Sequence, residues 1–378
     1  HYRADMTKIR SVVIMAGGSG ERFYPSSRLR KPKQLLRLVD DNKTMIEEAV
    51  DRIVPLIPVE HIFIITSELL QNPIREALPQ LPPENIVAEP AKKNTAPCLA
   101  LICQYIAEHF APKGYSPEDI SVAVLTADHF MRPADAFRST VDTALCFAED
   151  TGDIVTIGIV PTRPETGYGY IHTDQSANKL VKKVLSFKEK PDKETALSYI
   201  ADQSYYWNSG MFFWRLDGFF RELALHAPEI YSLCVDLSEQ LKGKTNTVQQ
   251  GAPTGIAAIY DVMPSISIDY ALMEKSQSIW VVPSTFSWDD VGSWDALFRT
   301  KDSDSNGNVI MGDVLIIDSK ECVIVNEQQD EKIIACVGLE NTVIVATNDV
   351  TVVCPVEHVQ NVKKIVETLR KQNKTEYL

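Results

Sequence analysis

The chain has 378 residues, of which 44% are hydrophobic and 24% charged, and this composition excludes disordered, collagen-like and disulfide-stapled proteins. Its formal net charge of −13 argues against nucleic-acid binding, and its apolar runs are shorter than the roughly 20 residues that cross a membrane. The seven cysteines are never spaced as CxxC, so we expect reduced thiols in a cytoplasmic protein. We expect residues 1–5, which precede Met6, to be a remnant outside the fold.

Between Ile9 and about Arg299, short β-branched runs alternate with longer amphipathic stretches, which is typical of repeated βα units. The predicted strands are Ser11–Ala16, His61–Thr66, Ser121–Thr126 and Ile154–Val160. After the first strand, Thr44 and Glu47 have the spacing of a capping box, which predicts the start of a helix. We therefore predict an α/β domain over residues 6–300, with a doubly wound, Rossmann-like sheet that is mixed but mainly parallel.

After Arg299 the sequence changes to short strand-like runs divided by turn residues. These runs are Val314–Ile317, Cys322–Val325, Lys332–Val337, Thr342–Ala346 and Thr351–Val353. A closing helix follows, with an apolar face formed by Val359, Val362, Ile365, Val366 and Leu369. Because a β-rich domain over residues 301–378 is too small to bury this face, we expect a homodimer through it. The alternative is that the helix folds back on the catalytic domain of its own chain.

A glycine-rich loop directly follows the first predicted strand. Glycines leave backbone N–H groups open to phosphates, and Arg22 and Lys33 would add the local cations that an acidic protein needs. The spacing is neither that of a Walker A loop nor that of a dinucleotide-binding fingerprint, so a different phosphate loop is expected. A glycine-rich turn with a solvated basic flank is the alternative. The loop residues are Gly17, Gly18, Ser19 and Gly20.

The sequence AGGSGERFYP, followed by KPKQ, resembles the signature of the sugar-nucleotide pyrophosphorylases, specifically the bacterial mannose-1-phosphate guanylyltransferases. Further motifs match in order up to residue 299: EP with KNTAP, ADH, TGYGYI, FKEKP, WNSGMF, SIDYA and WDDVGSW. The resemblance implies a catalytic domain that converts GTP and α-D-mannose 1-phosphate into GDP-mannose and pyrophosphate. It also implies a short left-handed β-helix at the C-terminal end. Because histidines are not clustered near that end, we expect no added cupin isomerase domain and a monofunctional transferase.

The resemblance also implies a magnesium site. A displacement among polyanions is catalysed mainly by charge neutralisation and alignment, and a divalent cation supplies both. The family pattern makes Asp128 and Asp290 the two Mg²⁺ ligands, with Arg22 and Lys33 as further catalytic groups. Asp289 competes with Asp290 for this role, and the alternative for Asp128 is a strand-end residue that caps a turn.

The same resemblance implies the contacts to the sugar phosphate. Lys190 matches the lysine that binds the sugar 1-phosphate, with Asp290 nearby, and Glu189 would accept hydrogen bonds from sugar hydroxyls. Tyr168, Gly169 and Asn208 complete the expected sugar-phosphate site. Their alternatives are a solvated loop edge for the FKEKP lysine and a core strand for WNSGMF. Asp269 is interpreted as a cap of a helix at residues 271–275.

Glu89 is the candidate that would select the base. A carboxylate can accept hydrogen bonds from both N1–H and the 2-amino group of guanine, and its alternative is a water-exposed turn residue. Asn94, Thr95 and Asp128 complete the expected nucleotide site. Two rival functions stay open: a transferase for another hexose 1-phosphate or nucleotide, and a regulatory homologue that binds sugar nucleotide without turnover.

Overall fold

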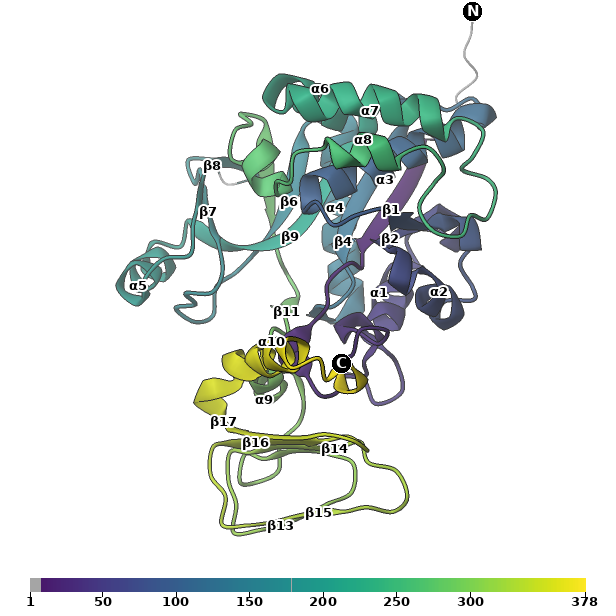
Figure 1. Ribbon diagram of the computed structural model, residues 1–378. Coiled ribbons are helices and arrows are strands. Elements are labelled where there is room, and N and C mark those ends of the chain that lie inside the picture. The colour runs from purple at the N-terminus through teal and green to yellow at the C-terminus, as the bar shows by residue number, and fades with distance from the viewer. Residues whose placement is uncertain (1–7, 178) are drawn as a thin grey trace, which may run out of the picture. The chain divides into compact units, whose positions relative to one another are not determined.

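The computed structural model describes residues 8–177 and 179–378, so the remnant predicted at residues 1–5 lies outside it. The described chain forms two compact units, each assembled from separated segments (Figure 1). Unit 1 contains the chain up to Ala16, Val50–Thr126 and Arg132–Ser287, and unit 2 contains Gly17–Ala49, Ala127–Met131 and Trp288–Leu378. These units are interleaved along the sequence, whereas the boundary expected at residue 300 separates two consecutive ranges. That boundary stays a prediction.

Unit 1 is built on a sheet with the strand order β3-β2-β1-β4-β9-β6-β10-β8-β7. The first four strands are parallel, as are β6 and β10, whereas β9 runs antiparallel between β4 and β6, so the sheet is mixed as predicted. The strands are β1 (Ile9–Met15), β2 (Ile62–Ser67), β3 (Ile86–Glu89), β4 (Ile120–Thr126), β6 (Ile154–Ile159), β7 (Tyr170–Thr173), β8 (Lys182–Lys188), β9 (Tyr205–Arg215) and β10 (Ile279–Pro283).

Helices cover the sheet of unit 1. The apolar helix α3 (Thr95–Phe110) is buried along most of its length and shares one core with Val13, Val122 and Val124 of the central strands. In this core it packs against α7 (Pro228–Leu241), which in turn packs against α6 (Leu216–His226). The helix α4 (Ala134–Thr151) packs against β4, β6, β9 and β10. The remaining helices of unit 1 are α2 (Glu68–Ala77), α5 (Lys193–Asp202) and α8 (Ala257–Asp261), whereas α1 (Met45–Ile53) begins in unit 2 and ends in unit 1.

The Thr44 cap predicted before α1 is present, although Glu47 bonds to the Thr44 hydroxyl rather than to the backbone N–H that a full capping box uses. The backbone N–H of Glu47 donates to Thr44 Oγ1 over 3.3 Å, and the Thr44 hydroxyl donates to Glu47 Oε1 over 3.1 Å. The first helical N–H groups have no partner inside their helix, so these bonds fix where α1 begins.

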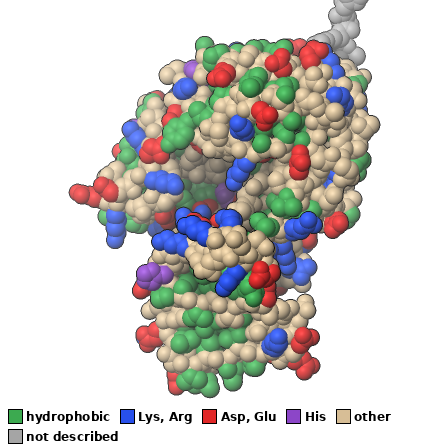
Figure 2. Space-filling view, viewed as in Figure 1, with side chains coloured by type: hydrophobic (Ala, Val, Ile, Leu, Met, Phe, Trp, Pro, Cys, Tyr) green, Lys and Arg blue, Asp and Glu red, His purple; other side chains and the backbone are tan. Residues whose placement is uncertain are grey.

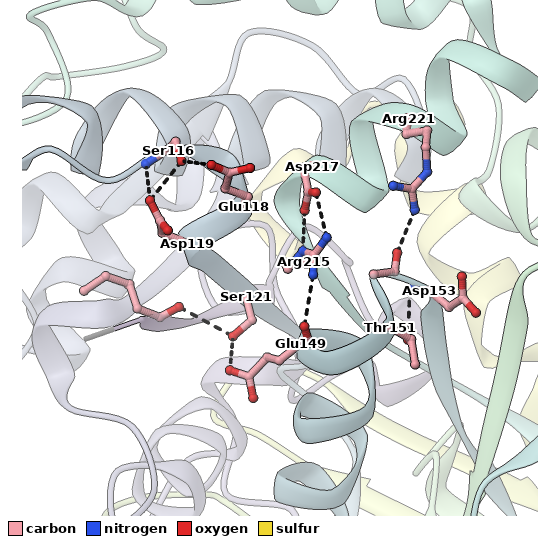
Figure 3. A network of polar contacts seen from close by, with 12 residues as sticks. Ser116, Glu118, Asp119, Ser121, Glu149, Thr151, Asp153, Arg215, Asp217 and Arg221 are labelled. Carbon is pink, nitrogen blue, oxygen red and sulfur yellow. Dashed lines mark hydrogen bonds and ion pairs between the residues drawn. The ribbon is translucent and has the colours of Figure 1, made fainter. Parts of the chain in front are cut away.

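A polar network ties the end of α4 to β4 and β9 (Figure 3). Arg215 donates to both carboxylate oxygens of Asp217, at 2.7 and 2.8 Å, and also to the backbone oxygen of Glu149 at 3.0 Å. The Ser121 hydroxyl donates to Glu149 Oε2 over 3.1 Å. Arg221 donates to the Gly152 oxygen that follows the helix. These bonds give the charged side chains of this network partners within unit 1, so we assign the network a structural role.

Unit 2 contains parallel β coils near the C-terminus. The strands β12 (Val309–Met311), β14 (Val323–Asn326) and β16 (Thr342–Ala346) pair in parallel, and β17 (Thr351–Pro355) pairs antiparallel with β16. The strands β13 (Val314–Ile317) and β15 (Ile334–Val337) form a second, two-stranded parallel sheet. The core of this unit joins Phe23, Leu36 and Met45 from its first segment to Val309, Val325 and Val345 from its last.

The closing helix corrects one expectation. It forms a 3₁₀ turn (Val356–Val362) followed by α10 (Lys363–Lys371), and Val359, Val362 and Val366 are buried. Val362 and Val366 pack with Tyr24 and Val352 of the same unit. The apolar face expected to form a dimer is therefore covered by its own chain, because segments distant in sequence meet there.

All seven cysteines lie among the described residues, and none of them forms a disulfide. No helix in the described ranges is long and apolar enough to cross a membrane.

Candidate functional site

The glycine-rich loop after β1 belongs to unit 2. Gly17, Gly18 and Ser19 are exposed, and a Cβ added to either glycine would meet no atom within 4 Å. Packing therefore does not require these two glycines, whereas a ligand that approaches the backbone closely would. Gly20 differs, because its φ is +63° and an added Cβ would overlap with the side chain of Lys33. The loop thus lies directly against Lys33.

Lys33 connects the two segments that carry the predicted metal ligands. Its ammonium contacts Asp128 Oδ2 at 3.0 Å and donates to the backbone oxygen of Asp290 at 2.8 Å. The side chain is 8% exposed and lies over the ring of Phe23, 5.7 Å from the centroid. The structure therefore brings together Lys33, Asp128 and Asp290, which are widely separated in sequence.

Asp128 is ionised in this setting. Burial opposes the charged form, but the ammonium of Lys33 and the neighbouring His129 hold the pKa of Asp128 below its ordinary value. The indole N–H of Trp288 donates to His129 Nδ1 over 3.2 Å, so a neutral His129 carries its proton on Nε2. This nitrogen lies 3.8 Å from Asp128 Oδ1. His129 was missed by the sequence prediction, although it stands in the ADH motif.

Asp289 and Asp290 have different surroundings, which distinguishes the two candidates. Asp289 is buried and accepts from Arg299 Nε at 2.6 Å, from Arg299 Nη2 at 3.3 Å and from the backbone N–H of Val291 at 2.8 Å. Val291 has a φ of +48°, which is strained for a β-branched residue. Asp289 therefore holds this loop in shape, and Asp290 remains the candidate ligand.

The residues of this cluster fit a hard divalent cation. Asp128 and Asp290 offer carboxylate oxygens, and in the described part of the chain no group of three or more His, Cys, Asp or Glu side chains could hold a metal ion. Mg²⁺ commonly uses one or two protein carboxylates together with water and substrate phosphates. The donor set therefore suits magnesium better than zinc, which prefers nitrogen and sulfur ligands.

Arg22 lies in the 3₁₀ turn after the loop and is exposed. Its guanidinium donates to Gln360 Oε1 over 3.0 Å, and Gln360 Nε2 donates to Ser293 Oγ over 2.9 Å. Arg22 is thus linked to the WDDVGSW segment through a glutamine that the motif comparison could not identify.

The predicted base-binding residues belong to unit 1. Glu89 ends β3, and burial raises the pKa of its carboxyl group against an opposing hydrogen bond from Tyr260. Asn94 Oδ1 accepts from the backbone N–H of Thr95 at 2.8 Å, at the start of α3. Thr95 Oγ1 accepts from the backbone N–H of Ile268 at 2.7 Å. Asn94 and Thr95 therefore shape the loop in this structure, and their expected role in nucleotide binding stays a prediction.

The predicted sugar loop is also in unit 1. The backbone N–H of Asn208 donates to the Gly169 oxygen over 2.9 Å, which joins the loop to β9. The ring of Tyr168 lies edge-on to Trp207 at 5.0 Å, and Arg163 donates to the Tyr168 hydroxyl over 3.2 Å. The structure therefore brings Tyr168, Gly169 and Asn208 to one place.

Asp269 and Tyr270 extend this group. Asp269 Oδ1 accepts from Asn208 Nδ2 at 3.1 Å, and burial raises the pKa of Asp269. The Tyr270 hydroxyl donates to Glu189 Oε1 over 2.7 Å, next to the exposed Lys190. The cap interpretation of Asp269 was wrong, because this residue begins a π-helical turn (Asp269–Met273) and makes no capping bond. Its partner lies 61 residues away, so local spacing gave no signal of the contact.

Comparisons with known proteins identify the family of this chain. A family model described as nucleotidyl transferase matches residues 11–307, and one described as a MannoseP isomerase/GMP-like beta-helix domain matches residues 312–369. A mannose-1-phosphate guanylyltransferase of Escherichia coli is 39% identical over 375 residues, covering 97% of this chain and 75% of that protein.

Two further relatives extend the comparison. The alginate biosynthesis protein AlgA of Pseudomonas fluorescens is 36% identical to this chain. The match covers 96% of this chain and 72% of the length of AlgA. A solved structure from Thermus thermophilus, described as mannose-1-phosphate geranyltransferase, is 29% identical with a TM-score of 0.81. That match covers 97% of this chain and all of the other.

Proposed function

The chain belongs to the nucleotidyl transferase family, and from this premise we propose that it transfers GMP from GTP to α-D-mannose 1-phosphate. The products are GDP-mannose and pyrophosphate. The observation that carries the proposal is the buried Lys33, which contacts both Asp128 and the backbone of Asp290 beside an open glycine loop. The name of the Escherichia coli relative supports the choice of substrates.

The chemistry requires alignment and charge neutralisation. An oxygen of the sugar phosphate attacks the α-phosphorus of GTP, a new P–O bond forms, and the bond to the β-phosphate oxygen breaks as pyrophosphate leaves. Asp128 and Asp290 would hold Mg²⁺, which would neutralise charge at the phosphates when bound. Lys33 keeps the two aspartate segments together, while the backbone N–H groups of Gly17–Gly20 and the side chain of Arg22 bind phosphate oxygens.

The residues of unit 1 orient the base and the sugar. Glu89 accepts hydrogen bonds from guanine, and Lys190 neutralises the sugar phosphate. Glu189 and Asn208 bind sugar hydroxyls, and their orientations are fixed by Tyr270 and Asp269.

The substrate assignment is tested by measuring pyrophosphate release over four nucleoside triphosphates and the 1-phosphates of mannose, glucose, galactose and fucose. We expect the highest kcat/KM for GTP with mannose 1-phosphate, and no release without a divalent cation. A higher kcat/KM for another pair would support the rival transferase. Binding of GDP-mannose without pyrophosphate release from any pair would support the regulatory homologue.

We further propose that residues 6–300 form the catalytic domain and residues 301–378 the β-rich domain, because the two family models meet near residue 310. We also propose a cytoplasmic location. Seven cysteines without disulfides suit a reducing compartment.

We also propose that the enzyme is a homodimer, through a different surface from the one that the sequence suggested. Side chains that alternate along β13 and β15 are apolar and exposed: Leu315, Ile317 and Val337, at 52%, 48% and 68%. Figure 2 shows hydrophobic side chains gathered on this β-rich part. An apolar sheet face of this kind is stabilised when a second copy covers it.

The dimer is tested by light scattering on the full chain. The charged double variant Leu315→Asp/Val337→Asp is expected to be monomeric at micromolar concentration, whereas the wild type and Val353→Asp stay dimeric. Val353 is a matched control because it is a similarly exposed valine on β17, which belongs to the other sheet. A monomeric wild type, or a dimeric double variant, would contradict the proposal. Truncation at Thr300 is unsuitable because it would remove part of the core around Phe23.

A further inference from the structure

The carboxylate of Glu89 lies in an unusual place for a charge. It stands at the carboxyl end of the edge strand β3, and burial raises its pKa. Glu89 is half-buried, and a carboxylate withdrawn from water is costly unless hydrogen bonds satisfy it. The identity of its partners therefore matters for the orientation and charge of Glu89.

The principal partner is Tyr260, which comes from α8, 171 residues further along the chain. Its hydroxyl contacts Glu89 Oε2, and because an ionised carboxylate can only accept, the tyrosine donates. Tyr260 has no exposed surface and packs in the main core of unit 1 with Ile256 and Met263. The ring is thus locked, and its hydroxyl defines a fixed point for the carboxylate.

Two further contacts surround the same carboxylate. The thiol of Cys98, in the first turn of α3, lies within hydrogen-bonding reach of Glu89, and the charge of Lys92 favours its ionised form. Lys93 Nζ donates to the backbone oxygen of Asp261 over 3.3 Å, which joins the loop after β3 to the end of α8. The loop, α3 and α8 therefore converge on Glu89.

We propose that Tyr260 is a positioning residue for base selection, whose hydroxyl orients Glu89 so that its remaining lone pairs accept from guanine. The inference rests on the proposed function. Guanine presents two adjacent donors, N1–H and the 2-amino group, whereas adenine presents an acceptor at N1. A carboxylate fixed in one orientation can meet both donors at once, and a rotating one loses this match.

The test is Tyr260→Phe in the full chain, which keeps the ring and removes the hydroxyl. We expect KM for GTP to rise about tenfold, as for loss of one hydrogen bond to a charged group, while KM for mannose 1-phosphate changes less than about twofold. The preference for GTP over ITP, which lacks the 2-amino group, should fall in parallel. A purely structural role of Tyr260 would not change KM for GTP and the GTP/ITP preference while leaving KM for mannose 1-phosphate nearly constant.

The matched control is Tyr105→Phe. Tyr105 is also buried in unit 1, but its hydroxyl donates to the backbone oxygens of Glu84 and Thr245. We expect this variant to retain the wild-type KM for GTP and preference over ITP. Both variants are assayed at a temperature at which circular dichroism shows them folded.

A double-mutant cycle with Glu89→Gln completes the test. If Tyr260 acts through Glu89, its removal should have little further effect on KM for GTP in the Glu89→Gln background. Additive effects, or an unchanged GTP/ITP ratio in Tyr260→Phe, would overturn the inference. A wild type that is inactive with GTP and mannose 1-phosphate would instead refute the proposed function.

Discussion

Asp128→Asn is expected to lower kcat by at least about 100-fold, a loss of roughly 3 kcal/mol of transition-state stabilisation. The variant removes a preformed negative charge from the proposed Mg²⁺ site, and leaves the ammonium of Lys33 opposite a neutral amide. Asp290→Asn should have an effect of similar size. Both are measured by pyrophosphate release at saturating GTP, mannose 1-phosphate and Mg²⁺.

Asp302→Asn is the control, because Asp302 is an exposed aspartate of the same unit. It should retain wild-type turnover, and thermal unfolding should be similar for all three variants. Direct titration with Mn²⁺, followed by its electron paramagnetic resonance signal, separates cation binding from chemistry. Near-normal turnover of Asp128→Asn would eliminate the ligand assignment.

Lys190→Ala and Lys33→Ala should separate the two substrates. We expect Lys190→Ala to raise KM for mannose 1-phosphate by roughly 10- to 100-fold, as for loss of one charge-assisted hydrogen bond, with a small change in KM for GTP. Lys33→Ala should mainly lower kcat or raise KM for GTP, because it leaves Asp128 without its ammonium partner. Initial rates with each substrate varied at saturation of the other give all four constants.

Lys193→Ala is the control for charge alone, because Lys193 is an exposed lysine at the start of α5, three residues after Lys190. It should leave both KM values within about twofold of wild type, the range of small surface effects. Equal effects of Lys190→Ala and Lys33→Ala on both KM values would show that the partition between substrates is wrong.

Local sequence signals predicted much of the fold. The β-branched runs gave β1, β2, β4 and β6 to within a residue or two, and Thr44 with Glu47 marked the start of α1. The motifs likewise identified Lys33, Asp128 and Asp290, which the structure brings together. These features depend on neighbours in sequence or on motif identity, so they can be recognised without the fold.

The contacts that could not be predicted join distant segments. The motif pattern preferred Asp290 over Asp289, but it gave no sign that Arg299 and the strained Val291 hold Asp289 in place. The pairings of Tyr260 with Glu89 and of Asp269 with Asn208 likewise follow no local period. Sequence spacing carries no information about such contacts, because the topology of the sheet decides which side chains meet.

Unit 2 is assembled from early and late segments of the chain, so its folding must wait during synthesis on the ribosome. Phe23 and Met45, which flank Lys33 in the first segment, share their core with Val309 and Val345, about 300 residues later in the chain. At 5 to 20 residues per second, the early segment waits on the order of 15 to 60 s for these partners to be translated. A nascent chain therefore cannot assemble the core that supports the loop and the aspartate cluster until the segment from Val309 to Val345 has left the ribosome.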